Sequence, residues 1–336
     1  MTSANVPGDP CFRRDVVTGR WVLIAPHRRG SPRDFMHETS LVRNAGTCPF
    51  CPGHENSTAS TTAERIGADG HWVARSFHNL YPMVVRAGSL PATPAPTAPV
   101  RTSSGFHEVV VETPTHGVDL SDLDDAHARA VIDLYRERLA HMATHPEARA
   151  IAMFKNRGPR AGASLYHAHG QVVSLPIVPP GVRRRDFIAA RHHQKHGVGA
   201  LAASRDAELA AAVRVVESTD HFVVYCPFAP HRSNEIWIVP LDASPSLVRA
   251  PEAACAELGP LLTRTLRRMR AVTSDADHNV IVRTPALAHW DAPWALWHVE
   301  VLPRRGGDAG FELSTGTQCV LMPPEESAAL LRDAKV

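Results

Sequence analysis

Two similar segments, one in each half of the chain, constrain the fold more than any other feature. Their sequences are HGQVVSLP (residues 169–176) and WHVEVLP (297–303), and each is the last strand expected in its half. In both halves the expected order is strand, strand, helix, strand and final strand, which predicts an internal duplication. A chain of 336 residues, 44% of them hydrophobic, is large enough for two units, which we expect over residues 11–185 and 205–332.

Periodic apolar patterns predict the other elements. In the first half we expect a hairpin over 11–26, an extended segment over 71–86, strands over 107–112 and 150–155, and a helix over about 122–145 that is capped by residues 121–124. In the second half we expect strands over 221–226, 235–240, 278–284 and 297–303, a helix over 252–272 and a closing helix after Pro323. The basic segment 181–197 is expected to link the halves, and residues 309–318 form a polar tail.

The first of the two repeated segments follows the richest concentration of polar and small residues in the chain. His167 and His169 are one residue apart, and Gln171 follows at the same spacing. Residues i and i+2 of a strand point to the same face, so both imidazoles can address one site. The preceding loop, 158–164, is rich in small residues that let backbone N–H groups approach a phosphate. The alternative is a solvated loop with incidental histidines.

Cys48 and Cys51 form a C-x2-C motif, the spacing at which two thiolates bind one metal ion. The chain has no second such motif, so the remaining ligands would have to come from distant histidines. A redox role would require the cysteines to begin a helix within a βαβ unit, whereas here Pro52 and Gly53 follow them. The motif therefore favours a metal site over a redox site.

An arginine-rich loop lies near the N-terminus, with Arg28, Arg29 and Arg33. It is either a solvated surface turn or a clamp for a diphosphate, because guanidinium groups bind phosphate oxygens in pairs.

The composition excludes several classes of protein. The formal net charge is only +2 and the charged residues are spread evenly, so a nucleic-acid partner is not indicated. No apolar run approaches 18 residues, and the first ten residues lack the basic and apolar regions of a signal peptide, so we expect no membrane segment. Only two of the six cysteines are close in sequence, which fits a reducing cytoplasm.

An ordered set of motifs resembles one family. The motifs are PHR, CPFCPGHE, NLYP, NRGPRAGASLYHAHGQ, AHWDAPWALWHVEVLPR and AGFELSTGTQ, and they extend over residues 11–332. Together they resemble the galactose-1-phosphate uridylyltransferases, a branch of the histidine-triad superfamily that also contains ADP-glucose phosphorylase. The resemblance implies an α+β fold with two tandem histidine-triad-like units, in which helices flank antiparallel sheets. It also implies a homodimer that transfers a nucleoside monophosphate between sugar 1-phosphates by double displacement.

The resemblance also assigns roles to individual residues. It implies that His169 is the nucleophile, that Gln171 holds a phosphoryl oxygen, and that one structural Zn2+ is bound by Cys48, Cys51, His116 and His167. The residues that match contacts to the nucleotide sugar and the sugar 1-phosphate are Arg28, Asn79, Asn156, Gly162, Ala163, Ser164, Phe311, Glu312 and Gln318. The last three belong to a tail that, in the family, reaches across the dimer interface.

The chain departs from the family pattern at three places. Ser31 stands where an arginine is usual, so Arg29 or Arg33 would have to substitute for it. Leu80 stands where the uridylyltransferases have an acidic residue near the nucleoside. The family often has a second metal site in the other half; His221, His289 and His298 could contribute to one here. Because Glu300 replaces a histidine, we expect the second site to be empty or degraded.

Four functions remain open at this point. The first is transfer of UMP from UDP-glucose to galactose 1-phosphate or a similar hexose 1-phosphate, which the six-residue interval from Glu312 to Gln318 favours. The second is transfer of an adenylyl group from ADP-glucose to phosphate. The third is nucleotide hydrolysis of the histidine-triad type, and the fourth is a zinc-stabilised sensor of nucleotide sugars, which would not explain an exposed nucleophile beside a phosphate loop.

Overall fold

One continuous antiparallel sheet runs through both halves of the chain. The computed structural model describes residues 9–29, 45–86 and 100–336, and within them ten strands pair in the order β3-β4-β5-β7-β6-β11-β12-β10-β9-β8. The strands are β3 (Thr61–Ile66), β4 (Trp72–His78), β5 (His107–Val111), β6 (Ala150–Arg157), β7 (His169–Leu175), β8 (Val215–Ser218), β9 (Phe222–Tyr225), β10 (Ile236–Pro240), β11 (His278–Arg283) and β12 (His298–Pro303). Each half contributes five strands, and β6 pairs with β11 where the halves meet.

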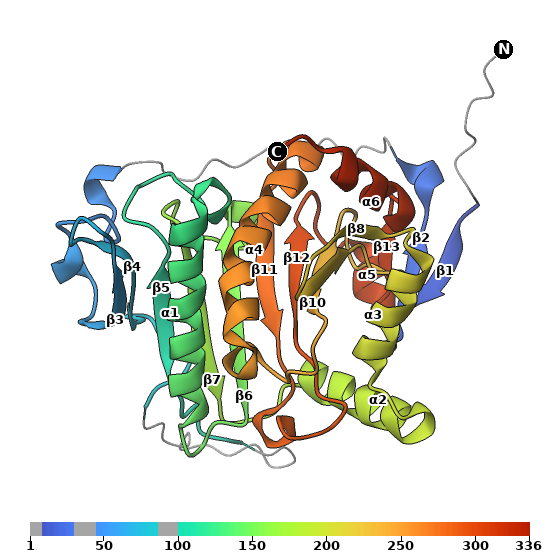
Figure 1. Ribbon diagram of the computed structural model, residues 1–336, viewed down its shortest axis with the longest axis horizontal. Coiled ribbons are helices and arrows are strands. Elements are labelled where there is room, and N and C mark those ends of the chain that lie inside the picture. Colours follow the sequence, from blue (N-terminus) through green and yellow to red (C-terminus); the bar gives the residue numbers. More distant parts are fainter. Residues whose placement is uncertain (1–8, 30–44, 87–99) are drawn as a thin grey trace.

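Two long helices cover one face of this sheet (Figure 1). They are α1 (Asp125–Ala143) and α4 (Glu252–Thr273). The Asp124 carboxylate caps α1 by accepting a hydrogen bond from the backbone N–H of His127. The apolar sides of both helices pack on alternate strand residues, including Val110 and Val172, and form the largest apolar core.

The opposite face is covered by different layers in the two halves. In the second half, Leu201 of α3 (Ala200–Ala211) packs against Tyr225 and Trp237. In the first half, the segment that contains Cys48 and Phe50 packs on β4 and β5. The candidate metal ligands in this segment therefore lie on the face of the sheet that α1 and α4 leave uncovered.

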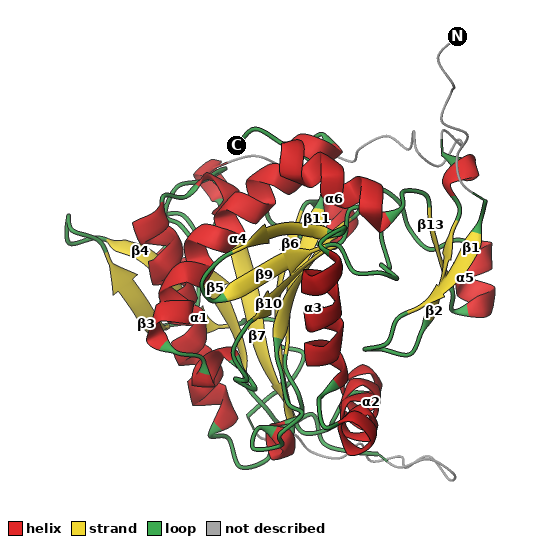
Figure 2. Ribbon diagram, turned by 45° about the vertical axis from the view of Figure 1, so that its right-hand side comes forward, coloured by secondary structure: helices red, strands yellow, loops and turns green. Residues whose placement is uncertain are grey.

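A second, three-stranded sheet stands apart from the main one (Figure 2). In it β2 (Trp21–Ile24) pairs antiparallel with β1 (Cys11–Arg14) and parallel with β13 (Gln318–Val320). The short helix α5 (Gly310–Thr315) precedes β13, and α6 (Pro324–Asp333) follows it. Both views place α5 and β13 at the end of the molecule far from β7.

The α+β architecture predicted from the sequence is confirmed, and most of the predicted elements form. The elements that the sequence did not predict are α2 (Pro180–His196), which occupies the segment that we expected to be a connection, α3 directly after it, and the edge strands β3 and β8. Also not predicted were α5 and β13, which fall within or at the end of the expected polar tail. Among the described residues, no helix combines the length and the apolarity that crossing a membrane requires.

Candidate functional site

Strand β7 brings the two predicted catalytic side chains together. It begins at His169 and lies between β5 and β6. Because side chains alternate along a strand, His169 and Gln171 share the face turned away from α1, and Gly170 between them faces α1. His169 lies opposite Val111 and Gln171 opposite Val109 in the pairing with β5.

The imidazole of His169 is held as a neutral base. It is buried, and its Nδ1 lies 2.8 Å from the backbone carbonyl oxygen of His167, which only a protonated Nδ1 can bond. The lone pair is therefore on Nε2. Burial lowers the pKa of His169 to about 4, against the opposing effect of the His167 carbonyl and with the help of the Lys155 charge. The ring of Phe50 contacts His169 edge-on, with centroids 5.2 Å apart.

A histidine that sequence reasoning did not single out fixes the orientation of Gln171. His107 is buried, and its Nδ1 accepts a hydrogen bond from the backbone N–H of Met83 at 3.0 Å. The proton of the ring is therefore on Nε2, which donates to Oε1 of Gln171 at 2.8 Å. Gln171 is then left with its NH2 group as the donor that can reach a phosphoryl oxygen. Burial lowers the pKa of His107, although its bond to Gln171 acts in the opposite direction.

Asn79 joins the same cluster from the end of β4. Its backbone N–H donates to the carbonyl of His107 at 2.9 Å, and its side-chain oxygen accepts from the N–H of Tyr81 at 2.8 Å. The neighbouring Leu80 is 57% exposed, so an apolar side chain and not a carboxylate is presented beside Asn79.

The predicted phosphate loop follows β6 and is held in place from both ends. Asn156 on β6 accepts a hydrogen bond from the side chain of Asn279 at 2.8 Å, and Asn279 also donates to the carbonyl of Ala161 at 2.9 Å. At Gly158, φ is +82°, and a Cβ there would lie 1.9 Å from Asp277, so only glycine fits. The remaining predicted residues of the loop are Gly162, in a left-handed conformation, Ala163, which is buried, and Ser164, which is exposed.

A hollow of about 400 Å³ lies beside this loop. His167 and Ala168, which directly precede the proposed nucleophile, are among the residues that line it, together with Asn156 and the loop residues 157–160. The hollow is therefore adjacent to the strand that carries His169, although His169 itself does not line it.

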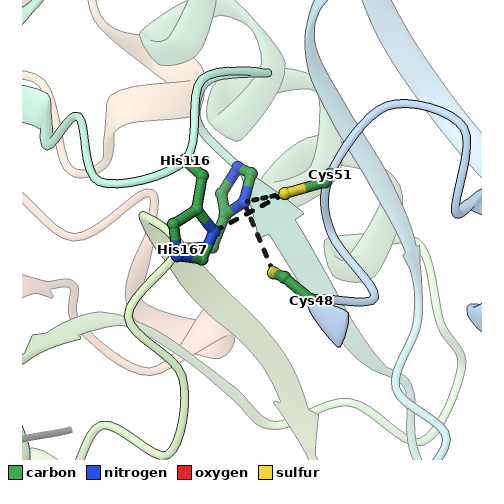
Figure 3. A group of neighbouring side chains, drawn as sticks. All are labelled: Cys48, Cys51, His116 and His167. Carbon is green, nitrogen blue, oxygen red and sulfur yellow. Dashed lines mark hydrogen bonds between the residues drawn. The ribbon is translucent and has the colours of Figure 1, made fainter. Parts of the chain in front are cut away.

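The four predicted metal ligands converge on one point (Figure 3). Cys48 and Cys51 come from the turn that covers β5, His116 from the turn after β5, and His167 from the start of the β7 segment. Their candidate ligand atoms all lie within 4.8 Å of one another. Nδ1 of His167 is 3.6 Å from each sulfur, and Nδ1 of His116 is 3.5 Å from Sγ of Cys51.

These distances agree with tetrahedral coordination of a single ion. A metal–sulfur bond of about 2.3 Å and a metal–nitrogen bond of about 2.0–2.1 Å, at a tetrahedral angle, separate sulfur from nitrogen by about 3.5–3.6 Å. Nε2 of His167 lies 2.7 Å from the carbonyl oxygen of Thr113, so this bond orients the ring and leaves Nδ1 for a metal. Without a cation, burial and the neighbouring Cys48 raise the pKa of Cys51 to about 11, so the charge of an ion would be needed to hold this thiol as a thiolate.

The histidines of the second half do not gather in the same way. Nδ1 of His289 lies 2.7 Å from Asp186, and Nε2 of His298 lies 3.2 Å from Glu300. Glu300 in turn forms an ion pair with Arg283 at 2.7 Å. Within residues 9–29, 45–86 and 100–336, only the Cys48 cluster brings three or more candidate ligands to metal-binding distance.

The remaining predicted substrate contacts form a separate cluster. Arg28 and Glu312 line one hollow of about 340 Å³ at the three-stranded sheet. Gln318 lies on β13 opposite Val22, and Phe311 is on α5. In one copy of the chain this cluster is remote from β7, as both views show. Ser31 and Arg33, which bear on the predicted diphosphate clamp, lie outside the described residues.

The chain resembles proteins of known activity over most of its length. Residues 9–179 match the family model described as galactose-1-phosphate uridyl transferase, N-terminal domain. The ADP-glucose phosphorylase of Arabidopsis thaliana is 32% identical over 97% of this chain and 93% of its own length. The galactose-1-phosphate uridylyltransferase of Streptomyces lividans is 28% identical over 77% of this chain and 66% of its own length.

Solved structures of proteins from the same two groups also resemble this chain over nearly its whole length. A crystal structure of an ADP-glucose phosphorylase from Arabidopsis thaliana with bound ADP-glucose has a TM-score of 0.83 at 29% identity, and covers 98% of this chain and all of its own. A structure described as uridylyltransferase has a TM-score of 0.75 at 26% identity, and covers 96% of this chain and 97% of its own. The chain therefore belongs to the galactose-1-phosphate uridylyltransferase family of nucleotidyltransferases.

Proposed function

We propose that this enzyme moves a nucleoside monophosphate from a nucleoside diphosphate hexose to an acceptor through a covalent bond to His169. The observation that carries the proposal is the environment of this imidazole, which is neutral, is bonded through Nδ1 to the backbone carbonyl of His167 just before β7, and keeps its lone pair on Nε2. A neutral imidazole is a competent nucleophile at pH 7 and needs no base to activate it.

The reaction has two balanced steps. In the first, Nε2 of His169 attacks the α-phosphorus, an N–P bond forms, and the P–O bond to the sugar 1-phosphate breaks. In the second, an oxygen of the acceptor attacks the same phosphorus and the N–P bond breaks, which restores the imidazole. The carboxamide NH2 of Gln171 would stabilise the charge on the phosphoryl oxygens. The backbone N–H groups of residues 160–163 already donate to Asp277 or to carbonyl groups of the loop itself.

We further propose that the ion bound by Cys48, Cys51, His116 and His167 is Zn2+. This donor set and its tetrahedral spacing suit zinc, and four protein ligands leave no open position for a substrate. When bound, such an ion supplies structural cross-linking and keeps the thiolates deprotonated. The residues themselves would tie the Cys48 turn, the segment after β5 and the start of β7 together, directly beside His169.

The donor that we propose first is ADP-glucose, with inorganic phosphate as the acceptor. The similarity to an ADP-glucose phosphorylase over nearly the whole length supports this choice, as does Leu80, an exposed apolar residue at the position where the resemblance implies an acidic residue in the uridylyltransferases. The second candidate is UDP-glucose with a hexose 1-phosphate such as galactose 1-phosphate as the acceptor. The family match and the six-residue interval from Glu312 to Gln318 support it.

Trapping the intermediate tests the nucleophile and the donor together. The enzyme is incubated with ADP-glucose or with UDP-glucose and no acceptor, and its intact mass is measured. We expect an adenylyl adduct on the wild type and none on His169→Gly, whereas a uridylyl adduct would select the second candidate. Sustained release of nucleotide to water without an acceptor, or an adduct that persists in His169→Gly, would refute the proposal.

We also propose that the active enzyme is a homodimer in which the cluster with Arg28 and Glu312 completes the site of the other copy. The distance of this cluster from β7 within one chain supports this arrangement. A mixture of His169→Gly and Arg28→Ala subunits, unfolded and refolded together, should then recover activity that neither variant has alone. Activity that never exceeds the sum of the two parents would count against a shared site.

A further inference from the structure

A buried, charged network lies on the helix side of β7, directly behind the proposed nucleophile. The Tyr135 hydroxyl on α1 donates to Oε1 of Glu112 at 2.8 Å. Nζ of Lys155 on β6 forms ion pairs with Oε2 of Glu112 at 2.5 Å and with Asp119 at 2.9 Å. All four side chains are buried. Burial raises the pKa of Glu112, although the charge of Lys155 acts in the opposite direction. Burial lowers the pKa of Lys155, but the carboxylates of Asp119 and Glu112 outweigh it, so the pKa of Lys155 is raised.

Gly170 provides the space that this network occupies. It lies between His169 and Gln171, and it is paired with Lys155 across the sheet. A Cβ built at Gly170 would lie 2.0 Å from the Tyr135 hydroxyl oxygen, whereas the nearest other atoms, the carbonyl oxygen of Phe154 and Cζ of Tyr135, would be 3.1 Å away. The hydroxyl is thus the main obstacle to a side chain at this position, and it occupies the space beside Gly170, between the two residues that the reaction needs.

The network also reaches the metal-binding histidine through the backbone. The N–H of Glu112 donates to the carbonyl of Ala168 at 3.1 Å, and the carbonyl of the next residue, Thr113, accepts from His167 at 2.7 Å. The side chain of Glu112 is fixed from one face of the sheet while its backbone holds the segment that carries His167 and His169. A shift of Glu112 would therefore move both histidines.

We propose that Tyr135 is a positioning residue for nucleotidyl transfer. Its hydroxyl, held by Glu112 over Gly170, sets the position of the backbone from His167 to Gln171. It thereby sets the direction in which the lone pair of His169 Nε2 points. This inference rests on the proposed role of His169. Because a misplacement of about 1 Å can slow a reaction about 100-fold, the position of this backbone matters for the rate more than for the binding of substrate.

The test is a double-mutant cycle on single-turnover formation of the nucleotidyl-enzyme. Gly170→Ala should slow this step about 100-fold, because its methyl group collides with the hydroxyl. Tyr135→Phe, which loses one hydrogen bond but keeps the ring, should slow it about 3- to 10-fold with little change in KM. The double variant should be at least about 10-fold faster than Gly170→Ala alone, since the contact at 2.0 Å is then removed.

Controls separate positioning from loss of stability and from failure of the proposed reaction. Leu139→Ala, on the same helix and also buried, removes core contacts, and Leu139 is not among the nearest neighbours of a Cβ built at Gly170, so this variant should leave the rate per folded molecule unchanged. Rates are normalised to folded protein and to bound metal. A wild type that forms no adduct would refute the role of His169. If the wild type does form it, a double variant as slow as Gly170→Ala, or Tyr135→Phe at the wild-type rate, would refute the role of Tyr135 alone.

Discussion

Replacing His107 with phenylalanine tests whether Gln171 must be oriented in advance. The substitution keeps a ring of similar size on β5 but removes the Nε2–H that donates to Gln171 at 2.8 Å. Gln171 then keeps its own donor, but nothing holds the carboxamide with its NH2 group toward the site. The reaction should slow while the binding of the nucleotide sugar changes little.

The expected magnitude follows from the single hydrogen bond that is lost. Loss of a donor to a phosphoryl oxygen in Gln171→Ala should slow nucleotidyl transfer about 100-fold, or about 2.7 kcal/mol. Loss of the orienting bond in His107→Phe should cost about 1 kcal/mol, which is about 5-fold in rate. His107→Phe also leaves the N–H of Met83 without its acceptor, so the free energy of unfolding should fall by about 1–3 kcal/mol.

The assay is single-turnover formation of the nucleotidyl-enzyme by His107→Phe, Gln171→Ala and the double variant. If His107 acts only through Gln171, the double variant should be no slower than Gln171→Ala. Ser174→Ala is a matched control, because the buried Ser174 hydroxyl also accepts a hydrogen bond from a backbone N–H, that of Phe106 at 2.8 Å. Ser174 lies on β7 at the end away from His169. Additive losses from His107→Phe and Gln171→Ala, or an equal loss in the control, would refute the reasoning.

Three further predictions concern stability. Cys51→Ser should lower the bound metal and the melting temperature, and a chelator that lowers the melting temperature of the wild type should have no further effect on the variant. His278 is buried, and burial lowers its pKa to about 4, so between pH 6.5 and 4 the unfolded chain binds a proton that the folded chain does not, and stability falls as the pH falls through this window. Between pH 7.5 and 5, the free energy of urea unfolding should therefore fall by about 2 kcal/mol more for the wild type than for His278→Asn. Equal losses in the two proteins would contradict this. Lys155→Met leaves Glu112 buried without its cation, whereas Asp119 keeps its ion pair with Arg157 at 3.2 Å, and the variant should cost about 3–5 kcal/mol of unfolding free energy; a loss below about 1 kcal/mol would contradict the pairing.

Strong periodicity made most of the main sheet and the long helices predictable, and its absence explains what was missed. In α2 only Asp186 is buried, so the helix shows no apolar stripe. Its signals were Pro180 at the first turn and Gly197 in the left-handed conformation after the last, which are weak when considered alone. The edge strand β3 is half exposed and largely polar, so it lacks the apolar alternation of a core strand.

The candidate site also contains residues that the sequence revealed and residues that it did not. The spacing of Cys48 and Cys51, and that of His167 and His169, is local and visible in the sequence, and the resemblance added His116. By contrast, His107 is 64 residues from Gln171, and Tyr135 is 23 residues from Glu112. Neither pair belongs to a local motif, because the contacts exist only once β5, β7 and α1 have packed together.

The seam between β6 and β11 matters for anyone who wishes to truncate the protein. Five consecutive residues of β11 are in register with β6 in the middle of the sheet. A recombinant fragment that stops after residue 179 would leave β6 as an exposed edge strand, and such edge strands pair with strands of other molecules. We expect that fragment to self-associate when made alone. It should become soluble when the complementary fragment is co-expressed and its β11 pairs with β6.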